Sequence, residues 1–133
     1  TEVLDPLQML PAPGQGALAV ECRSSDAQLV AELAELDDDH ARAAVTAERS
    51  VLATLEGGCA APIGALAEVV EGEDGNEIWI RAVALSHDGA LSVRMSATGA
   101  PADAAGVGSR LASEMLADGA ARLAEPPDKR QNA

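Results

Sequence analysis

Three stretches of alternating apolar and polar residues in the second half of the chain constrain the fold most strongly. They cover residues 63–69, 78–85 and 91–98. In the last stretch every second residue is apolar: Leu91, Val93, Met95 and Ala97. A period of two indicates strands with one buried face. Residues 73–76 and 87–89 combine Asp and Gly, which is favourable hairpin chemistry, so the pattern predicts a three-stranded antiparallel sheet.

Before and after these strands in the sequence, apolar residues recur at the spacing typical of helices. We expect helices at residues 27–36, 40–56 and 103–118. Ser25 or Asp26 can cap the first helix, three aspartates at 37–39 suit the start of the second, and Gly119 ends or kinks the third. This order predicts an α+β fold, with the sheet covered on one face by helices.

One charged residue interrupts the apolar face of the middle helix. Steps of 100° per residue place Glu48 within the stripe formed by Ala41, Ala44, Val45, Leu52 and Leu55. A carboxylate there is costly unless it is paired. We therefore expect an interior ion pair or hydrogen bonds that orient the helix, and we give Glu48 and its neighbour Arg49 structural roles.

The core must be built from small side chains. The chain has no Phe or Tyr and a single Trp, so Ala, Val, Leu and Ile positions and Trp79 must supply the buried apolar area. We assign Met95 and Met115 to the core, and His40 and His87 to the surface.

The N-terminal third has a different character. Prolines and glycines dominate residues 1–16, and the apolar run at 17–22 predicts a buried strand. A buried strand needs neighbours, and no partner for it is evident nearby. We therefore expect the chain to be a piece of a longer protein, with this strand open to pairing with another chain.

The charge balance excludes several classes of partner. Nine basic residues stand against 22 acidic ones, a net charge of −13, which argues against binding to nucleic acid or to an anionic membrane. No run reaches membrane-spanning length, residues 1–3 do not start a signal peptide, and no Cys or His cluster has metal-ligand spacing. The acidic residues at 71–77 are typical of a solvated hairpin. These features predict a cytoplasmic protein with free thiols.

Two glycine-containing stretches carry the candidate chemistry. In LEGGCAAPIG at 55–64, Gly57 and Gly58 remove side chains beside Cys59. A preceding helix C-terminus and the lack of a nearby basic residue disfavour a thiolate, so a buried structural cysteine is the alternative. In PAPGQG at 11–16, glycines flank Gln15, whose amide could reach a ligand; a tight turn into a strand is the alternative there.

Together, and in this order, these stretches resemble the porphobilinogen deaminase family. The matching motifs are PAPGQGALAVECR at 11–23, TAERSVLATLEGGCAAPIGA at 46–65, EIWIRAVALSHDG at 77–89 and the helix DAAGVGSRLASEMLADGA at 103–120. The resemblance covers nearly the whole chain, and LEGGC-x-x-PIGA is its most specific motif.

The resemblance implies a transferase that polymerises four porphobilinogen units into hydroxymethylbilane, with release of ammonia, in heme and chlorophyll biosynthesis. It implies that Cys59 carries a covalent dipyrromethane through a thioether, with Gly57 and Gly58 beside it, and that Gln15 and Gly16 lie near the substrate cleft. It implies three parts: residues 1–10 as the tail of domain two, 11–36 as a returning strand and helix of the α/β domain one, and 37–133 as the cofactor-carrying domain.

The resemblance also limits what this chain can do. The family's catalytic aspartate and substrate-binding arginines belong to segments upstream of Thr1, so we expect no catalytic residue here and no activity from the chain alone. It implies a monomeric complete enzyme in which domains one and two are the partners of this portion. Two alternatives remain: a non-catalytic α+β interaction module with a structural cysteine, and a thiol redox domain in which Cys22 approaches Cys59.

Overall fold

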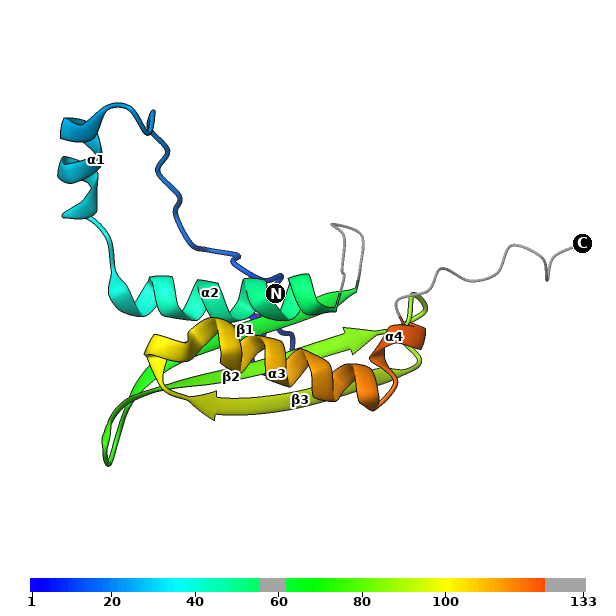
Figure 1. Cartoon of the computed structure of the whole chain (residues 1–133). Helices are drawn as coiled ribbons and strands as arrows, with labels where there is room; N and C mark the ends of the chain where they lie inside the picture. The colour runs from blue at the N-terminus through cyan, green and yellow to red at the C-terminus, as the bar shows by residue number, and fades with distance from the viewer. Residues whose placement is uncertain (56–61, 124–133) are drawn as a thin grey trace, which may run out of the picture.

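The computed structural model describes residues 1–55 and 62–123. Its centre is a three-stranded antiparallel sheet in the order β1-β2-β3, formed by Ile63–Gly72, Gly75–Leu85 and Ser92–Gly99. Two helices, α2 (Asp39–Thr54) and α3 (Ala104–Ala117), lie side by side on one face of this sheet (Figure 1). The predicted α+β fold, with helices on one face, is therefore confirmed.

The two predicted turns join the strands as expected. Gly72 pairs with Gly75 across the β1–β2 hairpin, where Gly75 has a φ of 117° that suits glycine. The β2–β3 loop is closed by the Asp88 carboxylate, which accepts hydrogen bonds from Ser86 Oγ (2.6 Å) and the Ala90 N–H (3.1 Å). These two bonds hold the pKa of Asp88 below its usual value.

The helix predictions were correct to within two residues at the described ends. Asp26 caps α1 (Ala27–Ala34) and Asp38 caps α2, each by accepting a hydrogen bond from a backbone N–H. The Ala41 N–H at this cap, together with His40, lowers the pKa of Asp38. A short 3₁₀ turn (η1, Pro101–Asp103) leads into α3, and Gly119, with a φ of 104°, separates α3 from α4 (Ala120–Leu123).

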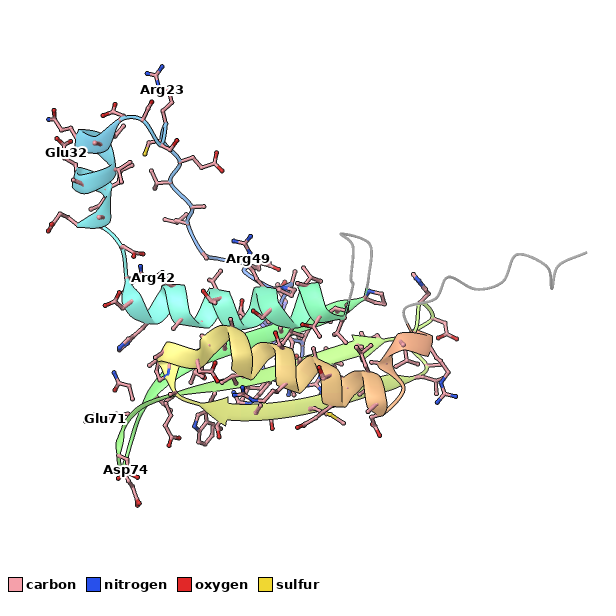
Figure 2. All side chains as sticks on the ribbon, in the orientation of Figure 1. Arg23, Glu32, Arg42, Arg49, Glu71 and Asp74 are labelled. Carbon is pink, nitrogen blue, oxygen red and sulfur yellow. The ribbon has the colours of Figure 1, made fainter. Side chains whose placement is uncertain are left out.

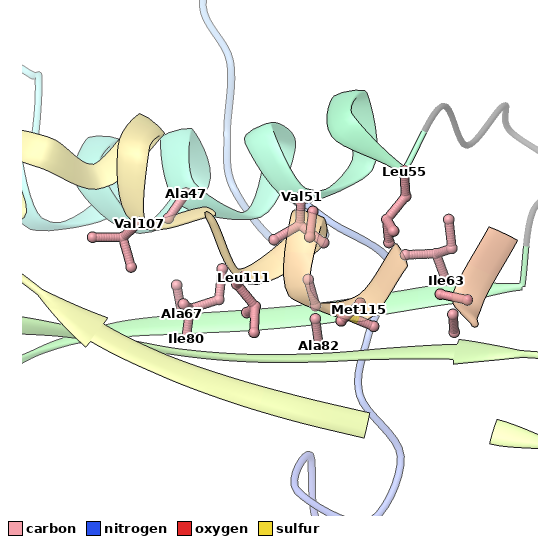
Figure 3. Close-up of a cluster of buried hydrophobic side chains, with 14 of the residues drawn as sticks. Ala47, Val51, Leu55, Ile63, Ala67, Ile80, Ala82, Val107, Leu111 and Met115 are labelled. Carbon is pink, nitrogen blue, oxygen red and sulfur yellow. The ribbon is translucent and has the colours of Figure 1, made fainter. Parts of the chain in front are cut away.

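The core fills the space between the helices and the sheet (Figure 3). Its largest fully buried side chains are Ile78, Ile80, Leu111, Met115, Val51 and Val107. Met95 is partly buried against this core, and both histidines are exposed, as predicted.

Two predictions of buried residues were wrong. Trp79 is 44% exposed, because Ile78 and Ile80 point toward the helices and the alternation of the strand turns Trp79 to the opposite face. There its ring centroid lies 6.0 Å from the Arg81 guanidinium carbon. Leu91 is 62% exposed, because β3 begins at Ser92 and the Leu91 carbonyl closes the loop by accepting from the Ser86 N–H.

The N-terminal arm (residues 17–38) stands away from the sheet (Figure 1). The buried strand predicted at 17–22 is wrong: these residues form no strand, and Leu18 is 97% exposed. Within the described part of the chain no strand lies beside this run, so its backbone has no ladder to join. α1 also has no buried residue.

Candidate functional site

The predicted cofactor residues Gly57, Gly58 and Cys59 lie outside the described residues. Their flanks are described and are firmly placed. Leu55, at the end of α2, and Ile63, at the start of β1, are both buried in the core. The Pro62 carbonyl accepts a hydrogen bond of 2.9 Å from the Leu85 N–H. The last turn of α2 contains no basic residue that would favour a thiolate nearby.

Gln15 and Gly16 form an exposed turn. The Gln15 N–H donates to the Ala12 carbonyl at 3.0 Å, and the Gln15 side-chain oxygen accepts from the Ala12 N–H at 3.3 Å. Gly14 and Gly16 have φ values of 77° and 89°, a conformation that disfavours residues with a side chain. The tight turn is therefore confirmed, although no strand follows it.

Among residues 1–55 and 62–123, Glu48 is the one buried charged residue. Its exposed fraction is 6%, and its two carboxylate oxygens accept backbone hydrogen bonds from Gly14 N–H (2.7 Å) and Ala67 N–H (2.8 Å). Bonds of this kind to a carboxylate offset the cost of burying it. The expected hydrogen bonds are confirmed. Arg49 is exposed on the side of α2 away from the sheet (Figure 2).

Sequence reasoning missed that the Gly-Gln-Gly turn and Glu48 belong to one cluster. The turn is part of an N-terminal strap (residues 7–16) that crosses the sheet face opposite the helices, from Arg94 of β3 to the free edge of β1. The Pro11 carbonyl accepts from the Ala65 N–H at 2.9 Å, and Arg94 donates to the Leu7 carbonyl at 2.9 Å. The only signal in the sequence was the position of Glu48 on an apolar face.

An open hollow of ≈ 730 Å³ lies between the start of the chain and β1. It is lined by Leu4, Asp5, Pro6, Leu7, Met9, Leu10, Pro11, Ala12, Gln15, Leu66 and Glu68. The charged members of this set, Asp5 and Glu68, are both acidic, so the hollow by itself would repel an anionic ligand.

Three described arginines have acidic neighbours. Arg42 is paired with Asp37 and Asp39, Arg110 with Asp103, and Arg81 lies 3.8 Å from a Glu68 oxygen. Across residues 1–55 and 62–123, no three His, Cys, Asp or Glu side chains gather as metal ligands. Nor does any helix in these two ranges have the length and apolar character needed to cross a bilayer.

Comparison with known proteins defines the class. The family model described as "Porphobilinogen deaminase, C-terminal domain" matches residues 42–117, which is more than half of the chain. A second, "Porphobilinogen deaminase, dipyromethane cofactor binding domain", matches residues 1–31. The chain therefore belongs to the porphobilinogen deaminase family, as the resemblance implied, and its first 31 residues match the family's dipyrromethane cofactor-binding domain.

Several proteins named porphobilinogen deaminase are similar to this chain over most of its length. Porphobilinogen deaminase of Nocardia farcinica is 57% identical over 128 residues, covering 92% of this chain and 37% of the relative. Those of Mycobacterium avium and Mycobacterium tuberculosis are 53% and 54% identical, each with 92% of this chain and 41% of the relative covered. The chain thus spans about two fifths of the length of these relatives.

Proposed function

We propose that the complete protein to which this chain contributes is a hydroxymethylbilane synthase. It joins four porphobilinogen units into hydroxymethylbilane with release of ammonia, in tetrapyrrole biosynthesis. The observation that carries this proposal is the motif LEGGCAAPIGA at 55–65, which places Cys59 inside the region that matches the family's C-terminal domain.

In this proposal Cys59 holds the dipyrromethane. The Cys59 sulfur bonds to the methylene carbon of a porphobilinogen unit, and the amino group leaves that carbon as ammonia and takes up the thiol proton. When bound, the dipyrromethane supplies the carbon at which further units are added. A thiol that reacts once needs no lowered pKa, which agrees with its position after the C-terminus of α2 and a last turn without basic residues. Gly57 and Gly58 leave room for the pyrrole beside the sulfur.

The rest of the cleft comes from the same protein. We propose that Gln15 and Gly16 face the substrate, and that upstream domains one and two provide the catalytic aspartate and the arginines for the substrate carboxylates. Residues 1–10 and 11–36 would belong to those domains, and 37–133 to the cofactor-carrying domain. The acidic hollow beside Gln15 and the net charge of −13 support an inactive isolated chain. We place the complete enzyme in the cytoplasm, as a monomer.

The test is the intact mass of this chain, produced in cells within the complete protein and then released by proteolysis. We expect a mass excess equal to one dipyrromethane, its loss in Cys59→Ser, and its retention in the matched control Cys22→Ser. Normal adduct formation in Cys59→Ser would refute the attachment site. An unmodified wild-type chain with a freely titrating Cys59 would favour the non-catalytic module.

A further inference from the structure

The buried Glu48 carboxylate is not used by the chemistry proposed above, yet each of its oxygens accepts a hydrogen bond. One oxygen accepts from the Gly14 N–H at 2.7 Å and the other from the Ala67 N–H at 2.8 Å. Only 6% of the residue is exposed, so few water molecules can compete for these bonds. Such short bonds from backbone N–H groups to a carboxylate are among the stronger hydrogen bonds in proteins.

The bond from Gly14 connects two separate parts of the family's architecture, and the bond from Ala67 anchors Glu48 within one of them. Gly14 lies in the region that matches the cofactor-binding domain (1–31), whereas Glu48 and Ala67 lie in the region that matches the C-terminal domain (42–117). The other ties of the strap, from Ala65 to Pro11 and from Arg94 to Leu7 and Gln8, are made upstream of Gly14. Glu48 is therefore the tie nearest to Gln15.

The Gln15 side chain next to this tie has a free hydrogen-bond donor among the described residues. Gln15 follows Gly14 directly, and its side-chain oxygen is already occupied by the Ala12 N–H. Among the described residues, none accepts a hydrogen bond from the Gln15 amide nitrogen, and the residue is exposed at the edge of the hollow. Its NH₂ group is thus a donor suited to a carboxylate of porphobilinogen.

We propose that Glu48 is a positioning residue: it fixes the Gly14–Gly16 turn against α2 and β1 and so holds the Gln15 amide where it binds a substrate carboxylate. This proposal rests on the proposed function. Glu48 acts through the turn and touches no substrate itself.

The first test, on the complete protein, is hydrogen exchange in Glu48→Gln. The amide has nearly the same shape but only one acceptor oxygen, so its NH₂ group must face one of the two backbone N–H donors. We expect exchange of the strap amides at 7–16 to become roughly ten- to hundredfold faster, as for loss of one hydrogen bond to a charged acceptor. Glu71→Gln, the same change on the exposed hairpin, should leave it unchanged. Val51→Ala, one turn further along α2, should lower thermal stability without a selective effect on the strap.

The second test is a double-mutant cycle on porphobilinogen turnover. We expect Glu48→Gln and Gln15→Ala each to raise KM several-fold with a smaller change in kcat, and the double variant to be no worse than the more affected single variant, because both remove the same contact. Independent, multiplying effects would mean that Glu48 is merely structural and would overturn the proposal.

Strap exchange and porphobilinogen turnover together distinguish failure of the proposed function from failure of the positioning role. If the wild-type protein does not turn over porphobilinogen, the proposed function is wrong and Gln15 loses its ligand, whereas strap exchange still decides whether Glu48 holds the turn. If turnover is normal but Glu48→Gln changes neither strap exchange nor KM, the positioning role alone is overturned.

Discussion

Replacing Gly108 in α3 with alanine should destabilise the fold, although alanine is the better helix former. A Cβ at this position would collide with the Ala47 carbonyl oxygen of α2 and would lie 2.9 Å from Ser50 Cβ. A backbone carbonyl cannot rotate away, so α2 and α3 must separate over the core that they share. Overpacking of this kind costs about 3 kcal/mol at the upper end of its range.

The gain in helix propensity offsets part of this cost. Gly→Ala in a helix interior is worth about 1 kcal/mol, which leaves a net loss of about 2 kcal/mol. For a domain of this size, that corresponds to a fall in Tm of roughly 8 °C. Thermal unfolding followed by circular dichroism measures it directly.

Gly106→Ala is the matched control in the same helix. There the three atoms nearest to the added Cβ all belong to the Asp103 carboxylate, a side chain that can swing away at the expense of its exposed ion pair with Arg110. Such a pair is worth about 0.2–1 kcal/mol, so the propensity gain should leave Gly106→Ala neutral or slightly stabilised. A Gly108→Ala variant as stable as Gly106→Ala would refute the close helix contact.

Two further predictions test the core and the β2–β3 loop. Ile80→Ala should lower the free energy of unfolding by about 2–5 kcal/mol, because Ile80 is fully buried. Trp79→Ala should cost clearly less despite its larger side chain, because Trp79 lies half-exposed on the open face. Urea unfolding of both variants measures the difference. Since the pKa of Asp88 is lower in the folded than in the unfolded state, its contribution to stability is present above the unfolded value and is lost as the pH falls through the folded one. Asp88→Asn should therefore flatten the acid limb of a stability–pH profile, with Asp74→Asn on the other hairpin as the control, and an unchanged limb would contradict the loop geometry.

The parts of the fold that sequence predicted are those set by local pattern. Alternation gave the three strands, and caps such as Asp26 and Asp38 gave the helix starts, because these signals act within a few residues. Trp79 was counted among the buried residues for its hydrophobicity, although it alternates with Ile78 and Ile80 along the strand. Once Ile78 and Ile80 face the helices, an intervening residue must face the other way.

The run at 17–22 shows a feature that local pattern could not predict. Its apolar composition is that of a buried strand, yet burial depends on what lies beside the backbone, and the described residues offer it no neighbouring strand. The composition thus indicates that Leu18 and Val20 favour burial, but it does not provide the neighbouring strand that would bury them. Both side chains remain largely exposed.

At the candidate site, the sequence shows that Glu48 needs hydrogen-bond donors but does not show which residues supply them. An apolar stripe with Glu48 inside it requires hydrogen-bond donors, and a carboxylate can accept from several. Nothing local indicates that one donor would come from Gly14, 34 positions earlier, and another from Ala67, 19 positions later. Because Gly14 adopts a positive φ, its N–H direction is set by a turn that few other residues could form, so the glycine motif and the buried glutamate determine each other's geometry. For this reason the two motifs are best tested as one unit, by paired variants at Glu48 and Gln15, instead of as separate sites.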